Sequence, residues 1–344
     1  MNSKITLSII IPHLIGKDIL YECINSIKSN TNNIDYEIIL VNNNCQDNSI
    51  KYIMKAFPEV VIVDSSINKG YAGGCNLGAQ HANGEYLFFL NNDTIITKNS
   101  IYLLIESIKK SNKISSIQPK IKNYFNKNNF DYAGGSGGYI DHLGYPFTRG
   151  RIFSSIEKDS GQYDTEEKIF WASGTGFITK KSIFKEVNGF DESLFAHMEE
   201  IDYHWKCLLN GYEVYIQPKS IIYHKGGQTL PYGSYKKIYL NHKNSIILFL
   251  TNNPKISILK LCKRIILEKI AFLFYLIKLD LKGAVAILHA NLWLLCNIKY
   301  LILRRRRNKQ LIKKYHPISE KLMRPYSIVK KYFYDRKRKF SQLD

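Results

Sequence analysis

The first 90 residues alternate short apolar runs with segments of helical spacing, and this alternation constrains the fold more than any other feature of the sequence. The apolar runs have the length of buried strands. They are Leu7 to Pro12, Glu37 to Val41, Val60 to Val63 and Tyr86 to Asp93. Strands that alternate with helices at this spacing predict an α/β fold with a parallel, doubly wound sheet.

Beyond residue 100 the periodicity is weaker. Residues 120–165 are rich in Gly, Asn, Tyr and Ser, and we expect long loops with short antiparallel strands there. A strand is expected around 171–179, and helical spacing returns at 197–210. Two separate short strands are expected on either side of Pro218.

The positive charge of the chain is concentrated at its carboxyl end. The net charge is +20, yet residues 1–240 carry 25 Lys and Arg against 24 Asp and Glu. Residues 241–344 carry 24 against 5, a net charge of +19. The partner of this last part should therefore be anionic, and phospholipid, a phosphorylated lipid and nucleic acid all meet that condition.

The six cysteines are scattered through the chain without a Cys-x-x-Cys pair. Their spacing argues against a zinc site or a disulfide framework and is typical of a reducing compartment. The chain also starts without the cationic segment and long apolar run of a signal peptide. We therefore expect a cytoplasmic location.

Residues 257–303 are rich in Leu and Ile but are interrupted by charged side chains. The longest charge-free run, Gly283 to Ile298, is shorter than the roughly 20 apolar residues of a membrane-spanning helix. Amphipathic helices in a membrane interface fit this pattern best, ahead of a helical bundle or oligomer interface and of a true membrane span. Arg304 to Arg307 would add a polybasic segment that an anionic leaflet attracts.

Asp93 ends the most apolar of the predicted strands, directly after Asn91 and Asn92. Ligands of α/β sheets bind at the carboxyl ends of the strands. A single carboxylate there suits a hard divalent cation that takes its other ligands from phosphate groups and water. The segment alone fits two interpretations equally well, a polar turn after a strand or a site for a diphosphate-bearing substrate.

The glycine-rich segment from Gly70 to Gly78 matches neither the dinucleotide-binding fingerprint nor a P-loop. Its glycines would still let the backbone approach a ligand closely at a helix N-terminus. On its own this signal is weak.

Three carboxylates, Glu199, Glu200 and Asp202, fall in the first turn of a predicted helix. Acids favour the positive end of the helix dipole, so this placement could be structural. Alternatively, one of them is a general base, because repulsion among like charges raises a pKa toward neutrality. His224 is equally ambiguous, since a lone histidine is more often structural, yet a neutral imidazole could share a divalent ion with Asp93.

The order of these segments resembles family 2 glycosyltransferases of the GT-A fold, and within that family bacterial rhamnosyltransferase-type enzymes. The resemblance covers roughly residues 5–250. It is carried by Ser8 to Pro12, Asn42 with Asp47, Asn68 to Asn76, Leu90 to Asp93, Tyr132 to Gly135, Arg149 to Arg151, Gly161 to Asp164, Ser173 to Gly176, Gly189 to Glu192, Glu199 to Asp202 and Tyr223-His224.

The resemblance implies a Rossmann-like, mostly parallel catalytic domain over residues 1–243, with a nucleotide-binding half to about 118 and an acceptor-binding half from about 119. A basic, helical membrane-associating region would follow over 244–344.

It also implies roles for individual residues. Asp93 and His224 would hold Mg²⁺ or Mn²⁺ on the diphosphate of the donor, and Glu200 would be the catalytic base, with Glu199 and Asp202 as alternatives. The nucleotide sugar would be bound by Pro12, Asn43, Asp47, Asn68, Gly70, Gly73, Asn76, Asn91, Asn92 and Arg149, and the acceptor by Trp171, Gly174 and Thr175.

Two departures from the family pattern affect these roles. Asn42 and Asn43 stand where many relatives have at least one Asp facing the base, although an amide oxygen can still accept from a pyrimidine imide N–H. Glu200 stands where Asp is commoner, and its extra methylene moves the carboxylate by about 1.5 Å.

The activity implied by the resemblance is inverting transfer of a sugar, from dTDP-rhamnose or a UDP-sugar, in cell-surface polysaccharide synthesis. The acceptor would be a saccharide, free or linked to a polyprenyl diphosphate, at the inner face of the plasma membrane. The anionic membrane surface would then be the partner of the basic region. Homo-oligomers are compatible with the same pattern.

Two other functions fit parts of the sequence. A nucleotidyltransferase also uses a doubly wound fold and an acidic metal site, but the loop Pro12 to Lys17 lacks the arginine usual after its first strand. A nucleic-acid-binding protein would explain the basic region, but its basic residues alternate with Leu and Ile, as in lipid-facing helices. We therefore expect no nucleic acid partner.

Overall fold

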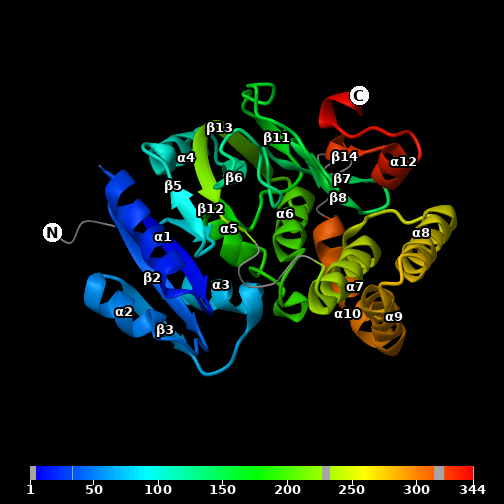
Figure 1. Ribbon diagram of the computed structural model, residues 1–344, viewed down its shortest axis with the longest axis horizontal. Coiled ribbons are helices and arrows are strands. Elements are labelled where there is room, and N and C mark those ends of the chain that lie inside the picture. The colour runs from blue at the N-terminus through cyan, green and yellow to red at the C-terminus, as the bar shows by residue number, and fades with distance from the viewer. Residues whose placement is uncertain (1–4, 33, 227–232, 314–320, 344) are drawn as a thin grey trace.

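The computed structural model describes residues 5–32, 34–226, 233–313 and 321–343. A large β-sheet with helices on both faces forms its centre, and the helices that follow residue 234 lie to one side of that sheet (Figure 1). The strand order in this sheet is β11-β13-β6-β12-β4-β1-β2-β3, and β5 pairs with β13.

The amino-terminal part of the sheet is parallel, as the alternation of strands and helices predicts. β1 (Leu7–His13) pairs with β2 (Tyr36–Asn43) and with β4 (Tyr86–Leu90), and β3 (Val61–Ser65) pairs with β2. Every residue of β4 is buried, which its run of Tyr, Leu and Phe requires. Three helices connect these strands: α1 (Lys17–Asn30), α2 (Ser49–Ala56) and α3 (Gly70–His81).

Beyond β4 the sheet is mixed, and this mixture brings distant segments together. β12 (Gly176–Lys180) is antiparallel to both β4 and β6 (Ile114–Asn123), and β13 (Glu213–His224) runs parallel to β6. β5 (Thr94–Ile96) is antiparallel to β13. His224 pairs with Thr94 in this register, so it lies beside the end of the Asn91 to Asp93 turn.

β13 is a single strand, and the prediction of two short strands around Pro218 is wrong. Its pairing with β6 shifts in register between Gln217 and Ile221. Proline lacks the N–H that a regular ladder needs, and an irregularity of this kind accommodates it without ending the strand. β11 (Glu167–Ile169) completes this edge by antiparallel pairing with β13.

A second, smaller sheet confirms the short antiparallel strands expected within 120–165. Its order is β10-β9-β8-β7-β14. Four of its strands are β7 (Gly138–Asp141), β8 (Pro146–Thr148), β9 (Arg151–Ile152) and β10 (Ser155–Ile156). The fifth, β14 (Met323–Arg324), comes from near the carboxyl end and pairs in parallel with β7. The carboxyl-terminal region is therefore joined to residues 138–141 by backbone hydrogen bonds.

The remaining helices divide between the two regions. The earlier ones are α4 (Ser100–Lys109), α5 (Lys181–Glu186), η1 (Glu192–Leu194) and α6 (Glu199–Leu209). The later ones are α7 (Tyr235–Asn252), α8 (Ile258–Ile277), α9 (Leu281–Cys296), α10 (Ile298–Lys313), α12 (Ile328–Phe333) and η2 (Phe340–Gln342).

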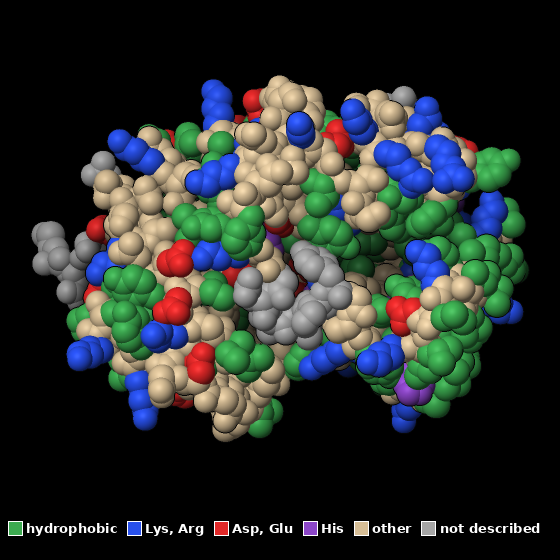
Figure 2. Space-filling model, viewed as in Figure 1, with side chains coloured by type: hydrophobic (Ala, Val, Ile, Leu, Met, Phe, Trp, Pro, Cys, Tyr) green, Lys and Arg blue, Asp and Glu red, His purple; other side chains and the backbone are tan. Residues whose placement is uncertain are grey.

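The four long carboxyl-terminal helices differ in what covers them. α7 buries Ile247 and Phe249 in the body of the molecule. In contrast, α8 and α9 leave many Ile and Leu side chains exposed, and Figure 2 shows these hydrophobic side chains gathered with Lys and Arg over the two helices. By length and composition, no single helix among the described residues could cross a membrane; α9 and α10 together would pass that test, but they are bent by 72°.

Candidate active site

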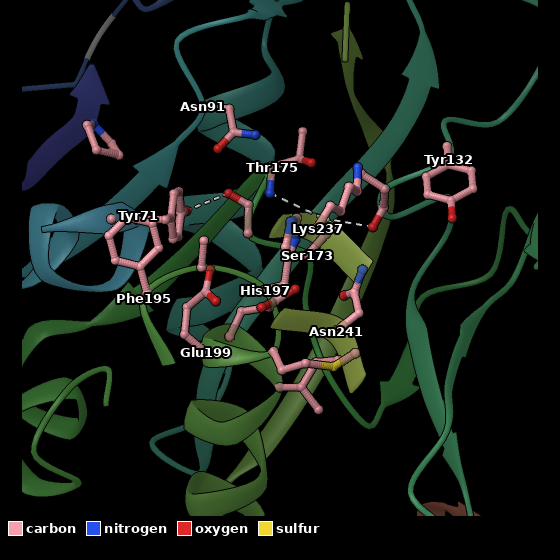
Figure 3. A pocket seen from close by; sticks show the side chains of 18 of the residues that line it. Tyr71, Asn91, Tyr132, Ser173, Thr175, Phe195, His197, Glu199, Lys237 and Asn241 are labelled. Carbon is pink, nitrogen blue, oxygen red and sulfur yellow. Dashed lines mark hydrogen bonds between the residues drawn. The ribbon is translucent and has the colours of Figure 1, made fainter. Parts of the chain in front are cut away.

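A cavity of about 680 Å³ opens at the carboxyl ends of β1, β2 and β4. Its walls come from segments far apart in the sequence, including the Asn91 to Asp93 turn, the Ser173 to Thr175 loop before β12, the start of α6 and the first turns of α7 (Figure 3). The sheet edge at which this cavity lies is where α/β folds bind ligands.

Asp93 and His224 meet at the floor of the cavity. Their side chains are buried, and Asp93 Oδ1 lies 3.1 Å from His224 Nε2. The other ring nitrogen, Nδ1, lies 2.9 Å from Asp131 Oδ1. Burial alone would lower the pKa of His224, but the two facing carboxylates, Asp93 foremost, raise it to about 10. Burial alone would likewise raise the pKa of Asp93, and the imidazolium lowers it instead.

The Asp93–His224 pair fits a divalent cation. One carboxylate and one imidazole are ligands that Mn²⁺ accepts, and both line the cavity with Asp93 Oδ1 facing His224 Nε2. Asp131 would hold the imidazole by Nδ1 and leave Nε2 for the cation, the usual arrangement behind a metal-bound histidine. The sequence analysis missed Asp131, although it directly precedes the Tyr132 to Gly135 segment that the resemblance included.

The first turn of α6 presents two unpaired acids to the cavity. Glu199 and Glu200 both line it, and the Oε2 atom of each is buried without a hydrogen-bond partner among the described residues. Withdrawal from water raises the pKa of Glu200 to about 7, although backbone hydrogen bonds oppose the rise. Burial, together with the charge of Glu200, raises the pKa of Glu199 well above its usual range. The Glu200 carboxylate can therefore take up a proton near neutral pH.

Asp202, also in the first turn of α6, does not line the cavity. Its Oδ1 accepts hydrogen bonds from Arg304 Nη2 at 2.6 Å and from Asn252 Nδ2 at 2.6 Å, and its Oδ2 lies 3.3 Å from Lys206 Nζ. Burial alone would raise the pKa of Asp202, but Arg304 and Lys206 lower it to about 2. An ionised carboxylate that is held by Arg304 and lies outside the cavity is a poor base, so the structure does not support Asp202 as the alternative base.

The same contact corrects the expectation for the Arg304 to Arg307 segment. Arg304 is buried and also bonds Asp191 Oδ2 through Nε at 2.9 Å, and Arg305 Nη1 donates to the Leu250 carbonyl at 2.6 Å. Both arginines therefore make hydrogen bonds within this molecule, whereas Arg306 and Arg307 are exposed.

Pro12, Asn43, Asn68 and Gly70 line the end of the cavity nearest β1 and β2. Asn43 is already occupied there: Nδ2 donates to the Gly70 carbonyl at 3.0 Å and Oδ1 accepts from Lys69 N at 2.9 Å. The Asn43 amide thus shapes the loop before α3. Because its N–H and C=O groups already bond the backbone, it has less hydrogen-bonding capacity for a nucleobase than the sequence suggested. Asn91 and Asn92 also line the cavity, and Asn92 Nδ2 bonds His13 Nδ1 at 2.8 Å.

Four residues assigned to the nucleotide sugar lie outside the cavity lining: Asp47, Gly73, Asn76 and Arg149. Asp47 accepts from the Gly16 and Ser49 backbone N–H groups. Asn76 binds both backbone groups of Phe190. Arg149 is buried against Glu167 and the Ser136 carbonyl. The Asp47, Asn76 and Arg149 side chains bond backbone groups or charges of nearby loops. Sequence order alone does not distinguish such structural contacts from ligand binding.

The glycines of α3 permit close packing within the protein. At Gly70 the φ angle is +68°, and a Cβ would come within 2.2 Å of the Phe195 carbonyl oxygen. At Gly73 a Cβ would lie 2.6 Å from Lys69 Cβ. The close approach predicted from these glycines is therefore made largely by the chain itself.

Trp171, Gly174 and Thr175, predicted to meet the acceptor, all line the cavity. The Gly174 carbonyl accepts from Tyr71 Oη at 2.5 Å, and Trp171 Nε1 donates to the Tyr139 carbonyl at 2.8 Å. The sequence analysis missed further lining residues: His13, Tyr71, Arg151, His197, Lys237 and Asn241. Tyr71 and Arg151 lie within segments that carry the family resemblance, although it implied no role for them, and the other four lie outside those segments.

Comparison with known proteins agrees with this geometry. A poly-beta-1,6-N-acetyl-D-glucosamine synthase of Staphylococcus epidermidis is 29% identical over 189 residues, which cover 54% of this chain and 42% of the synthase. The chain thus spans less than half the length of the synthase.

Two solved structures share the fold. One is a crystal structure of GalNAc-T7 with UDP, GalNAc and Mn²⁺, with a TM-score of 0.57 and 17% identity over 73% of this chain and 49% of that chain. The other is the mannosyltransferase PcManGT from Pyrobaculum calidifontis in complex with GDP-Man and Mn²⁺, with a TM-score of 0.52 and 11% identity over 98% of this chain and 89% of that chain.

None of these three is described as a rhamnosyltransferase, so that narrower resemblance stays a prediction. The broader one is confirmed, because the family model "Glycosyl transferase family 2" matches residues 8–187, more than half of the chain. With its GT-A fold, the chain belongs to glycosyltransferase family 2.

Proposed function

We propose that the chain is an inverting glycosyltransferase that moves a sugar from a nucleotide-diphosphate donor to a saccharide acceptor in the synthesis of a cell-surface polysaccharide. One observation carries this proposal: Asp93 with His224, and the unpaired Glu199 with Glu200, line the same cavity. Family membership leaves the nucleotidyltransferase and nucleic-acid-binding alternatives without support.

The donor would lie along the carboxyl ends of β1, β2 and β4. Its nucleoside would occupy the end lined by Pro12, Asn43, Asn68 and Gly70, and its diphosphate would reach Asp93. UDP in one structural neighbour and GDP-Man in another support a nucleotide donor. A UDP-sugar and dTDP-rhamnose both remain candidates for the donor. The Asn43 amide bonds backbone groups of the loop before α3, so it does not select one nucleobase over the other.

Asp93 and His224 would hold Mg²⁺ or Mn²⁺, with Asp131 orienting the histidine. Such an ion would neutralise the negative charge that grows on the departing diphosphate. Mn²⁺ in both neighbouring structures supports a divalent cation.

Glu200 would act as the base. Its carboxylate takes the proton of an acceptor hydroxyl as that oxygen bonds to the anomeric carbon of the donor sugar. The bond from the anomeric carbon to the diphosphate oxygen breaks in the same step, and the nucleotide diphosphate leaves from the opposite face. A pKa of about 7 keeps a useful fraction of Glu200 ionised while letting it accept a proton.

We further propose that the enzyme works at the cytoplasmic face of the plasma membrane. The exposed Ile and Leu side chains of α8 and α9, interspersed with lysines, suit an interface of anionic lipid. All six cysteines are unpaired, as expected in a reducing compartment. A surface of this kind would bring the cavity close to an acceptor linked to a polyprenyl diphosphate.

The test is a screen of nucleotide sugars for binding and hydrolysis with Mn²⁺ or Mg²⁺, followed by Asp93→Ala. We expect the variant to fold and to lose hydrolysis and transfer, because the remaining imidazole cannot hold the cation alone. The exposed Asp18→Ala, far from the cavity lining, is the matched control and should keep full activity. Near-normal turnover by the Asp93 variant would overturn the assignment of the metal site.

A further inference from the structure

The acceptor side of the cavity carries two cations that the proposed reaction does not use. Arg151, at the start of β9, and Lys237, in the first turns of α7, both line the cavity. Figure 3 shows Lys237, Asn241 and Tyr132 on the side of the cavity opposite Tyr71 and Asn91. The two cations are thus separated from the strand ends that would hold the nucleotide.

The two cations are held in place by the protein around them. The guanidinium of Arg151 lies over the Tyr132 ring, 4.5 Å from its centroid, and Nη1 contacts the Phe153 carbonyl at 3.4 Å. Lys237 belongs to a helix whose later turns are buried, and Asn241 follows one turn after it on the same face. Side chains fixed in this way lose little further freedom when a ligand binds.

Placing these cations together has an electrostatic consequence. Burial and the nearby charge of Arg151 both lower the pKa of Lys237. The acids that line the cavity are Asp93, which faces His224, and Glu199 and Glu200, whose own pKa values are raised. A bound anion would relieve the repulsion between Arg151 and Lys237, so this end of the cavity should favour a negatively charged group.

We propose that Arg151 and Lys237, with the Asn241 amide, form a binding site for a phosphate group on the acceptor. This inference rests on the proposed function, in which the cavity receives a saccharide acceptor. A guanidinium fork, an ammonium group and an amide donate from different directions, which suits the tetrahedral oxygens of a phosphate better than a planar carboxylate. The phosphate could belong to the diphosphate of a lipid carrier or to a phosphodiester within a polymer.

The test measures direct binding to the full chain in a buffer with EDTA, so that no cation at Asp93 contributes. The probes are geranyl diphosphate against geraniol for the lipid source, a short poly(glycerol phosphate) against glycerol for the polymer source, and glucuronate as a carboxylate. We expect at least one phosphate probe to bind, and Arg151→Gln and Lys237→Gln each to weaken it by roughly tenfold or more.

Lys237→Arg, which keeps the charge, should bind like the wild type, and so should Lys51→Gln, which alters an exposed lysine on α2. Thermal melting of each variant shows that it is folded. The proposal is overturned if no phosphate probe binds, if glucuronate binds as well as they do, or if the two Gln variants bind unchanged. Failure of the proposed function would appear separately, as a wild-type chain that neither binds nor hydrolyses any nucleotide sugar.

Discussion

α7 and α10 differ from α8 and α9 in their relation to the catalytic region, although all four come from the same basic part of the chain. α7 buries Ile247 and Phe249, and α10 inserts Arg304 behind α6. α8 and α9 expose a large apolar surface, although α8 also buries Arg264, which donates to the Leu143 carbonyl at 3.0 Å. α7 thus helps to line the cavity, and we propose that the apolar surface of α8 and α9 faces a partner.

The largest expected effect concerns the anchored pair. Arg304→Ala would leave Asp191 without its cation and Asp202 with Lys206 alone, and losing one partner of a buried ion pair costs about 3–5 kcal/mol of unfolding free energy. We expect transfer activity to fall with it, because α6 carries Glu199 and Glu200. Arg307→Ala, at an exposed position three residues on, should change the free energy of unfolding by less than about 0.5 kcal/mol. Equal chemical denaturation curves for the two variants would contradict the distinction between anchored and exposed helices.

A pair of matched truncations sharpens the same distinction. Ile247 on α7 is 0% exposed and Ile266 on α8 is 54% exposed. Ile247→Ala should cost about 2–5 kcal/mol through lost burial and the cavity left behind. Ile266→Ala should cost less than about 0.5 kcal/mol. Denaturant titration of both variants measures this, and a large loss for Ile266→Ala would mean that α8 is covered in the folded protein.

Arg304 on α10 also makes the acids of α6 differ in pKa, because it pairs with Asp202 but not with Glu200. A base must be ionised, so with a pKa of about 7 for Glu200 the rate of transfer should fall about tenfold per pH unit below 7 and level off above it. Glu200→Gln should lower the rate and remove this dependence while nucleotide-sugar binding persists. If Glu199→Gln has these effects instead, the base is Glu199.

The smallest expected effect concerns the exposed pair. Ile266 and Leu273 lie seven residues apart on one face of α8 and are both about half exposed. The double change Ile266→Ser and Leu273→Ser should reduce binding to vesicles rich in anionic lipid by roughly threefold or more, without loss of stability. Sedimentation of the protein with such vesicles over a range of salt concentrations measures this. A wild type that ignores vesicles but forms a dimer that the double variant lacks would identify the surface as an oligomer interface.

Sequence patterns predict much of the amino-terminal half and little of how the carboxyl-terminal region packs. The strands up to β4 follow from apolar runs. The order of motifs predicts that Asp93 and His224 share one site, and the two side chains lie 3.1 Å apart. Asp131 escaped notice because its role depends on a partner 93 residues away. The prediction for Arg304 was wrong for a different reason: four consecutive arginines look alike in sequence, whether they face solvent or a buried carboxylate.

The ion pair between Asp202 and Arg304 also bears on how the protein is synthesised. Asp202 is synthesised 102 residues before Arg304, so a nascent chain can contain the whole family segment while Asp202, on α6, still lacks its guanidinium partner. We expect a product of premature termination before α10 to carry that segment with a less stable α6. The carboxyl-terminal helices therefore bear on folding although they lie outside the family segment.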